Sequence, residues 1–288
     1  MIFLNERGLR AGWRLLIYAA FVAALGFGSE IVLQHFAPPT RGVFSPPYQF
    51  VGEVFSFVVV FGAALIMSRI EHRSPGVYGL PASGAFGKLF WQGFLIGLIE
   101  ISALMALIAV FGGYSFGTLA LHGSDILRWA IVWVIFFVFV GFFEEFLFRG
   151  YSQFTLADGI GFWPAAILLS GSFGYVHLKN PGEGPIGAAA VMIIGLVFAL
   201  TLRRTGNLWL AVGWHASFDF GETFLYSVPN SGMVFDGHLS NATLHGATWL
   251  TGGTVGPEGS VFSFLTMAIL AVVVYLLYPA NSSNPTLN

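Results

Sequence analysis

The chain contains no cysteine among its 288 residues. Disulfides, thiolate metal sites and cysteine catalysis are therefore excluded, although this absence does not fix the compartment. Charged residues are also scarce, at 9% of the chain against about 25% in a soluble domain. Hydrophobic residues make up 56% and the mean hydropathy is +0.78. Such a composition cannot cover a water-facing surface, and a net charge of −2 gives no support to nucleic-acid binding.

Long apolar runs predict an all-α polytopic membrane bundle, because helices satisfy their backbone polar groups inside a bilayer. Residues 1–288 are treated as a single transmembrane domain. About eight spans are predicted, and the fourth is long enough that we expect it to tilt or to protrude into the cytoplasm. The segment Pro229–Ser260 is rich in Gly, Ser, Thr and Asn and is expected to be an extramembrane loop, either free or folded back onto the bundle. The predicted spans are Trp13–Phe36, Phe50–Met67, Phe86–Phe111, Leu127–Ala157, Phe162–Lys179, Ile186–Leu202, Asn207–Ser227 and Val261–Tyr278.

Basic residues indicate the orientation of these spans. With a cytoplasmic N-terminus, the external segments contain three basic residues, Arg41, Arg128 and Lys179. The cytoplasmic segments then contain eight: Arg7, Arg10, Arg14, Arg69, Arg73, Lys88, Arg203 and Arg204. The positive-inside rule therefore places both termini in the cytoplasm. We expect an integral, multi-pass protein of a bacterial inner (cell) membrane, in contact with membrane lipid.

Three charges interrupt the fourth predicted span, in the stretch GFFEEFLFRG from Gly141 to Gly150. Glu145 and Arg149 are four residues apart on one helical face, with the glutamate first, which is the favourable order for an ion pair. An intramembrane arginine needs such a partner. Glu144 is rotated by about 100° from that face and is not compensated by the pair. Glu144 is therefore either a snorkelling structural carboxylate or a group available for chemistry.

Two later spans supply further polar side chains. The fifth contains FGYVH, in which Phe173 and His177 share a face, and the seventh contains HASFD, in which His215 and Asp219 share a face. Counted from the expected cytoplasmic helix ends, Glu144, the two histidines and the aspartate lie roughly 12 to 21 Å deep, at a rise of about 1.5 Å per residue. Because the helix directions alternate, this common depth predicts one intramembrane polar cavity.

These side chains are compatible with two hydrolytic chemistries. A buried carboxylate and an imidazole can together activate a water molecule, while a second imidazole donates to a developing oxyanion. Alternatively, a zinc ion with an open water position could be held by the same residues, Glu144, His177, His215 and Asp219. The chain has no HExxH motif that would support zinc independently. A nucleophilic serine is disfavoured because Ser170, Ser172 and Ser217, the serines near these motifs, show no sequence signal as nucleophiles.

Two other classes of function stay open on the residues alone. Intramembrane carboxylates and histidines also mark the pathways of proton-coupled transporters. Transporters often show repeats and paired broken helices, and the sequence shows neither. A non-catalytic membrane scaffold, such as an immunity protein, would keep the polar groups without performing the reaction.

The motifs EEFLFR, FGYVH and HASFD, in this order on successive apolar helices, resemble EExxxR, FxxxH and HxxxN/D of the CPBP family. This family comprises type II CAAX prenyl endopeptidases and bacteriocin-processing or immunity proteins, and the resemblance covers about residues 127–226, the expected catalytic core. It implies an intramembrane endopeptidase of glutamate-dependent or metalloprotease type. The catalytic residues would be Glu144 as the water-activating base, His177 as its assistant or a metal ligand, and His215 and Asp219 at the oxyanion or the metal. Glu145, Arg149 and Phe173 would shape the site.

Asp219 departs from the pattern of the eukaryotic-type members of that family, which carry asparagine at this position. An ionised aspartate cannot donate to an oxyanion. Asp219 is therefore protonated, orients His215 or binds a metal ion, and the choice between a metal-free and a metal-dependent mechanism stays open.

The remaining intramembrane carboxylates are interpreted as structural first. Glu30 and Glu53 lie near span ends and are expected to reach the membrane interface. Glu100 is expected to make a polar contact within the bundle or to line the cavity. Glu222 shares the helical face of His215, and its role is left open.

We predict from the sequence an intramembrane endopeptidase that hydrolyses a peptide bond of a membrane-associated or lipidated, CAAX-type protein or peptide. The substrate is expected to enter from the cytoplasmic side. Zinc is the one cofactor that the resemblance allows. The alternatives are a non-catalytic immunity or scaffold protein and a proton-coupled transporter.

Overall fold

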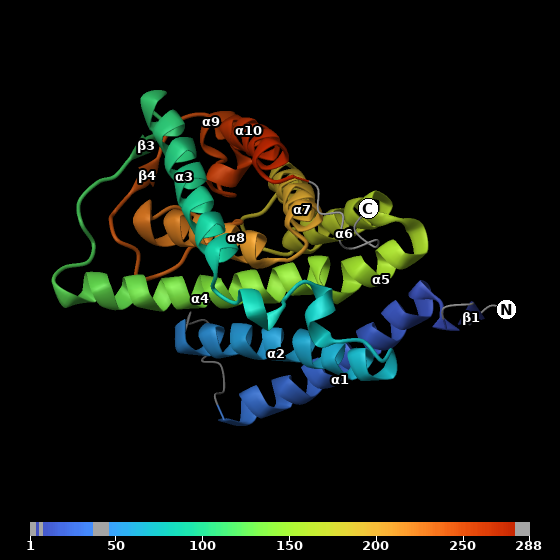
Figure 1. Cartoon of the computed structure of the whole chain (residues 1–288). Coiled ribbons are helices and arrows are strands. Elements are labelled where there is room, and N and C mark those ends of the chain that lie inside the picture. Colours follow the sequence, from blue (N-terminus) through green and yellow to red (C-terminus); the bar gives the residue numbers. More distant parts are fainter. Residues whose placement is uncertain (1–3, 6–7, 37–45, 280–288) are drawn as a thin grey trace.

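A computed structural model of the chain describes residues 4–5, 8–36 and 46–279. Helices make up most of it and strands very little (Figure 1), which confirms the predicted all-α class. Two short antiparallel strand pairs are present: β1 (Leu4–Asn5) with β2 (Gly8–Leu9), and β3 (Tyr114–Ser115) with β4 (Thr243–Leu244). The long helices are α1 (Ala11–Phe36), α2 (Pro46–Ile70), α3 (Lys88–Val110), α4 (Ser124–Arg149), α5 (Tyr151–Ile160), α6 (Phe162–His177), α7 (Pro185–Thr205), α8 (Trp209–Phe220) and α10 (Val261–Leu277).

Shorter helical turns connect these helices. A π-helical turn, η3 (Gly221–Leu225), continues α8 without a break. The others are η1 (Pro75–Tyr78), η2 (Ala82–Gly84), α9 (Thr248–Thr251) and η4 (Pro257–Gly259).

Five helical stretches among the described residues are long and apolar enough to cross a membrane. They are Ala11–His35, Tyr48–Ile70, Lys88–Val110, Ser124–Ile160 and Pro185–Thr205. The other three predicted spans contain the shorter helices α6, α8 and α10, of 16, 12 and 17 residues. An integral membrane bundle is thus supported, while the number of complete crossings stays a prediction.

The fourth predicted span lies within the apolar stretch Ser124–Ile160 and is interrupted once, while its tilt or protrusion stays a prediction. α4 ends at Arg149 and α5 begins at Tyr151, with Gly150 between them at φ −81° and ψ −123°. A Cβ atom on Gly150 would lie 2.4 Å from the carbonyl oxygen of Phe146, so a side chain does not fit at the bend. The chain therefore changes direction directly after the charged motif.

Helices α3 and α8 pack very closely at the centre of the bundle. A Cβ atom on Gly93 would lie 2.0 Å from the carbonyl oxygen of Leu210, and one on Gly97 would lie 2.3 Å from that of Trp214. Small residues four apart allow such an approach of two backbones. The contacts advance in the same direction along both helices, so α3 and α8 are parallel, and the indole N–H of Trp214 donates to Glu100 at 2.6 Å.

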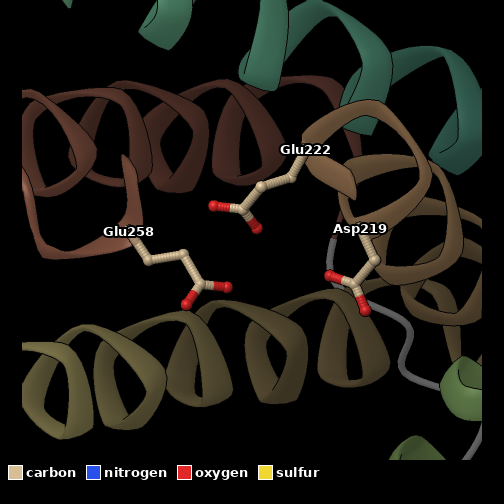
Figure 2. A group of neighbouring side chains, drawn as sticks. All are labelled: Asp219, Glu222 and Glu258. Carbon is tan, nitrogen blue, oxygen red and sulfur yellow. The ribbon is translucent and has the colours of Figure 1, made fainter. Parts of the chain in front are cut away.

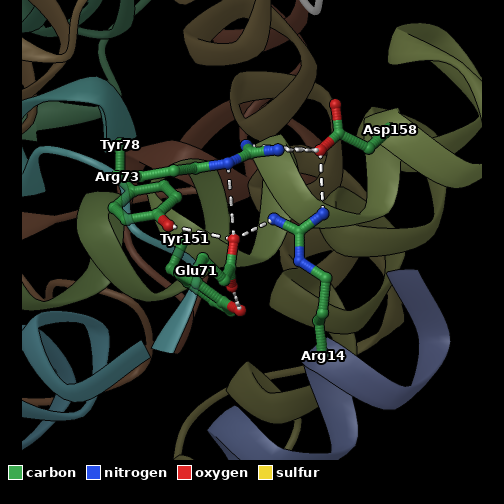
Figure 3. Close-up of polar contacts among 6 residues, drawn as sticks. All are labelled: Arg14, Glu71, Arg73, Tyr78, Tyr151 and Asp158. Carbon is green, nitrogen blue, oxygen red and sulfur yellow. Dashed lines mark hydrogen bonds and ion pairs between the residues drawn. The ribbon is translucent and has the colours of Figure 1, made fainter. Parts of the chain in front are cut away.

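A polar network joins the ends of α1, α2 and α5 (Figure 3). Arg14 pairs with Glu71 at 2.5 Å and with Asp158 at 2.9 Å, and both Tyr78 and Tyr151 donate hydrogen bonds to Glu71. Arg14 is only 6% exposed, so its two acidic partners compensate for its burial. The residues of the network are Arg14, Glu71, Arg73, Tyr78, Tyr151 and Asp158.

The two ends of the bundle differ in charge. One end, called here the arginine end, carries the network and the last turn of α7, where Arg203 lies over Trp163 and Arg204 donates to the carbonyl oxygen of Tyr275. The opposite end carries the start of α2, the α6–α7 connection and the segment 229–260. This segment folds back onto the helices: Trp133 of α4, for example, donates to the carbonyl oxygen of Gly237.

We expect Gly97→Ala to destabilise the protein by about 1–3 kcal/mol, because the added methyl group overpacks a contact made by backbone atoms of α8. The matched control is Gly26→Ala in α1, where no atom lies within 4 Å of the added Cβ. Thermal unfolding of the two purified variants in detergent measures the difference. Equal melting temperatures would show that the α3–α8 contact does not limit stability.

Candidate active site

The polar cavity predicted from the sequence is present. Its volume is about 280 Å³, and it is lined by all four predicted catalytic residues, Glu144, His177, His215 and Asp219. They come from three helices, α4, α6 and α8, so the motifs that are separate in sequence do meet in space. The lining is otherwise largely apolar and aromatic, as in most small-molecule and peptide sites.

Glu145 is the most enclosed carboxylate of the charged motif. Its Oε1 accepts from Arg149 Nη1 at 3.2 Å and from His215 Nδ1 at 2.9 Å. The side chain of Glu145 is 0% exposed and that of Arg149 is 1% exposed. The predicted ion pair is therefore present, and the same oxygen atom also holds the imidazole of His215, a contact that the sequence did not predict.

Arg149 lies on an aromatic surface. Its guanidinium carbon is 4.3 Å from the centre of the Phe173 ring, which suits a cation–π contact. A Cβ atom on Gly195 of α7 would lie 2.2 Å from Arg149 Nη2, so the missing side chain at this position leaves room for the guanidinium group. Phe173 thus supports the guanidinium group of Arg149.

The second nitrogen of His215 faces two carboxylates. Nε2 lies 3.5 Å from Glu144 Oε2 and 3.4 Å from Asp219 Oδ2. The ring is stacked on Phe198, with 5.6 Å between ring centres. The Glu144 side chain is 21% exposed, so Glu144 is the carboxylate of the motif that stays accessible from the cavity. Of the three roles left open for Asp219, this contact favours orientation of His215.

His177 is fixed by its own helix. Its Nδ1 lies 2.8 Å from the carbonyl oxygen of Phe173 and must donate to it, because a carbonyl group only accepts. In the neutral ring, Nε2 then carries the lone pair and is the atom that can accept a proton. The Phe173 ring packs edge-on against the imidazole at 4.7 Å.

The four residues predicted as zinc ligands do not form a compact ligand set. In the described part of the chain, one group of three or more acidic or histidine side chains has ligand atoms that all lie within 4.8 Å of one another, and it consists of Asp219, Glu222 and Glu258. His215 directs Nδ1 to Glu145. The donor geometry therefore does not fit a zinc ion on the predicted set, and the mechanism proposed below uses none.

Glu53 corrects one expectation from the sequence. It lines the cavity, and one of its carboxylate oxygens is buried without a hydrogen-bond partner, whereas we expected it at the membrane interface. The reason is that α2 begins at Pro46, four residues before the predicted start of the span. Glu53 therefore lies about two turns inside the helix and not near its end.

Two further carboxylates line the cavity. Glu100 is buried and accepts from Trp214 and from Thr266, so it is both a bundle contact and a cavity residue, as the sequence allowed. Glu258 of η4 was missed by the sequence analysis, because nothing in the polar segment distinguishes this glutamate from solvated residues of a loop. Burial and the charge of Asp219 raise the pKa of Glu258 to about 8.

The exposed part of the cavity lining lies at the end opposite the arginine end. It includes Gln49 at the start of α2, Val176 near the end of α6 and Met233 in the segment 229–260. The sequence predicted cytoplasmic termini and also cytoplasmic entry of the substrate. These two predictions are incompatible with this opening, because the termini and the opening belong to opposite ends of the bundle.

The family model described as type II CAAX prenyl endopeptidase Rce1-like matches residues 126–221. The family resemblance is thus confirmed. The Rce1-like segment begins in α4, ends at the first residue of η3 and contains all three motifs. It contains every predicted catalytic residue. It contains neither the helices α1 to α3 nor the polar segment 229–260.

Similarity to curated proteins extends beyond the Rce1-like segment. The chain is 25% identical over 231 residues to lysostaphin resistance protein A of Staphylococcus epidermidis strains ATCC 35984 and ATCC 12228. The match covers 77% of this chain and 58% of each relative, so the chain spans less than two thirds of their length. No solved structure matches this chain.

The neighbouring glutamates are expected to respond in opposite ways to the same substitution. Glu145→Gln leaves Arg149 buried without its anion and should destabilise the protein by about 3–5 kcal/mol. Glu144→Gln keeps the shape of an accessible side chain and should change stability by less than about 1 kcal/mol. Thermal unfolding in detergent measures both, and an equal loss in the two variants would contradict this division of roles.

Proposed function

We propose that the chain is an intramembrane endopeptidase in which Glu144 activates a water molecule for attack on a peptide carbonyl. The Rce1-like segment belongs to a protease family, which supports peptidase activity at the level of class. The observation that carries the proposal is the contrast between two adjacent glutamates. Glu145 is fully buried and its Oε1 holds both Arg149 and His215, whereas Glu144 is accessible from the cavity beside an oriented imidazole.

The reaction needs a base, an oxyanion donor and a proton for the leaving amine. Glu144 takes a proton from water, and the resulting hydroxide attacks the carbonyl carbon of the scissile bond. His177 Nε2 accepts a hydrogen bond from the same water and so positions it. His215 Nε2, when protonated, donates to the oxyanion, with Glu145 and Asp219 holding the ring. The C–N bond then breaks as Glu144 passes its proton to the amine nitrogen.

The location of the opening favours a substrate on the non-cytoplasmic side. The opening lies away from the arginine end, which the positive-inside rule assigns to the cytoplasm. We propose a membrane-associated peptide or protein segment presented at that face. A lipidated substrate anchors through its chain in one leaflet, and it would have to lie in the leaflet at the open end.

Proteolysis is tested by profiling new peptide termini in membranes of cells that produce either the wild type or Glu144→Gln at matched levels. We expect termini that appear with the wild type and are lost with the variant. The control is Glu30→Gln, an exposed carboxylate of α1 outside the cavity, which should retain all cleavage. Identical profiles for wild type and Glu144→Gln, with both proteins folded, would favour the non-catalytic scaffold.

The side of entry is tested with single cysteines, since the chain has none of its own. Asp236→Cys lies in the exposed segment at the open end, and Ser74→Cys lies next to the network of the arginine end. We expect a membrane-impermeant maleimide to label Asp236→Cys in intact cells and Ser74→Cys only after permeabilisation. The reverse pattern would place the opening in the cytoplasm and restore cytoplasmic entry.

A further inference from the structure

A second polar cluster lies in the wall of the cavity and shares one of the predicted catalytic residues, Asp219. It consists of Asp219 at the end of α8, Glu222 in η3 and Glu258 in η4. One oxygen atom from each lies within 4.8 Å of the other two, and Figure 2 shows the three carboxylates directed toward a common space. Glu222 and Glu258 both lie outside the Rce1-like segment.

Glu222 is the unusual member of this cluster. Its side chain is 0% exposed, and neither of its carboxylate oxygens has a hydrogen-bond donor among the described residues. Its polar neighbours are the carboxylates of Asp219 and Glu258, and two carboxyl groups form a hydrogen bond only when one of them is protonated. A fully buried carboxylate directed at two others is costly without a compensating positive charge.

The other two members are partnered by an imidazole and by a neutral hydroxyl group. Asp219 faces His215 Nε2 at 3.4 Å, on the side of the catalytic residues. Glu258 accepts from the hydroxyl group of Ser231 at 2.9 Å. In the described part of the chain, no lysine or arginine pairs with any of the three carboxylates. Like charges this close inside a protein repel strongly, so the cluster requires a bound cation or shared protons.

We infer that Asp219, Glu222 and Glu258 bind a divalent cation of about the size of calcium. Carboxylate oxygens are the preferred ligands of hard cations. Oxygen atoms on opposite sides of a calcium ion are roughly 4.6–5.2 Å apart, given Ca–O distances of about 2.3–2.6 Å, and the spacing of the cluster falls within that limit.

The cluster also has an entry path and a structural consequence. Asp219 and Glu258 line the cavity, so an ion can reach them from the open end of the bundle. A bound ion would join η4, at the end of the segment 229–260, to α8 and η3. It would thereby hold the wall of the cavity that this segment forms. Binding requires no proteolysis, so it stands or falls independently of the proposed activity.

The test uses the purified full-length chain in detergent, stripped with EDTA and dialysed. Titration with calcium chloride to 10 mM should raise the melting temperature by about 5 °C, and equilibrium dialysis with radioactive calcium should give one ion per chain. Glu222→Gln and Glu258→Gln should lose both effects. Asp236→Asn, which removes an exposed carboxylate of the same segment, should retain them.

A shorter side chain provides a second variant, should the amide variants fail to fold. Glu258→Asp keeps the charge but withdraws the ligand, and it should weaken calcium binding at least tenfold. The inference is overturned if the wild type shows no calcium-dependent stabilisation, or if all variants are stabilised equally. It is also overturned if acidification alone stabilises the wild type while calcium does not, because the carboxylates would then share protons.

Discussion

One carboxylate oxygen, Glu145 Oε1, accepts from both Arg149 and His215, and the arrangement of the cavity depends on it. A buried arginine in an apolar bundle is tolerated only with an anion beside it. Glu145 pairs with Arg149 within α4 and accepts a hydrogen bond from His215 of α8. It therefore also fixes the distance and rotation between these two helices. The imidazole is held at Nδ1, which directs Nε2 toward Glu144. The adjacent Glu144 is not needed to compensate Arg149, because Glu145 already does so, and it stays accessible from the cavity.

The second constraint is the close approach of helices and side chains around the polar groups. Glycine residues allow this approach at three places. Gly97 allows α3 to lie against α8, Gly150 allows the chain to bend after the charged motif, and Gly195 leaves space for the guanidinium of Arg149. None of these residues is chemically active. Each removes a Cβ atom that would separate two groups, and in an apolar bundle close packing is what holds helices together. The geometry of the polar site therefore depends on these glycines, because a side chain at any of them would push the neighbouring groups apart.

The sequence predicts the parts of this arrangement that depend on one helix. Hydrophobic runs reveal the helices, and spacing within a helix reveals the pair of Glu145 with Arg149 and the contact of His215 with Asp219. Contacts between helices are not encoded in any spacing, so neither the bond from His215 to Glu145 nor Glu258 as a cavity residue was predicted. Glu53 was misplaced for a different reason, since an error of four residues in a helix start moves a side chain from the interface into the interior.

The asymmetry of the bundle links the catalytic residues to the cation cluster. Charge at the arginine end is satisfied by reciprocal pairs such as Arg14 with Glu71 and Asp158, which close that end. The opposite end contains a surplus of carboxylates around the cavity, and His215 is the one cation-forming side chain shown to contact them in the described structure. An excess of buried negative charge attracts cations and protons. Asp219 lies between the catalytic residues and the cation cluster. An ion bound by Glu222 and Glu258 would attract the Asp219 carboxylate and weaken its interaction with His215. The orientation of the catalytic imidazole would then rest more heavily on Glu145, the residue that also compensates Arg149.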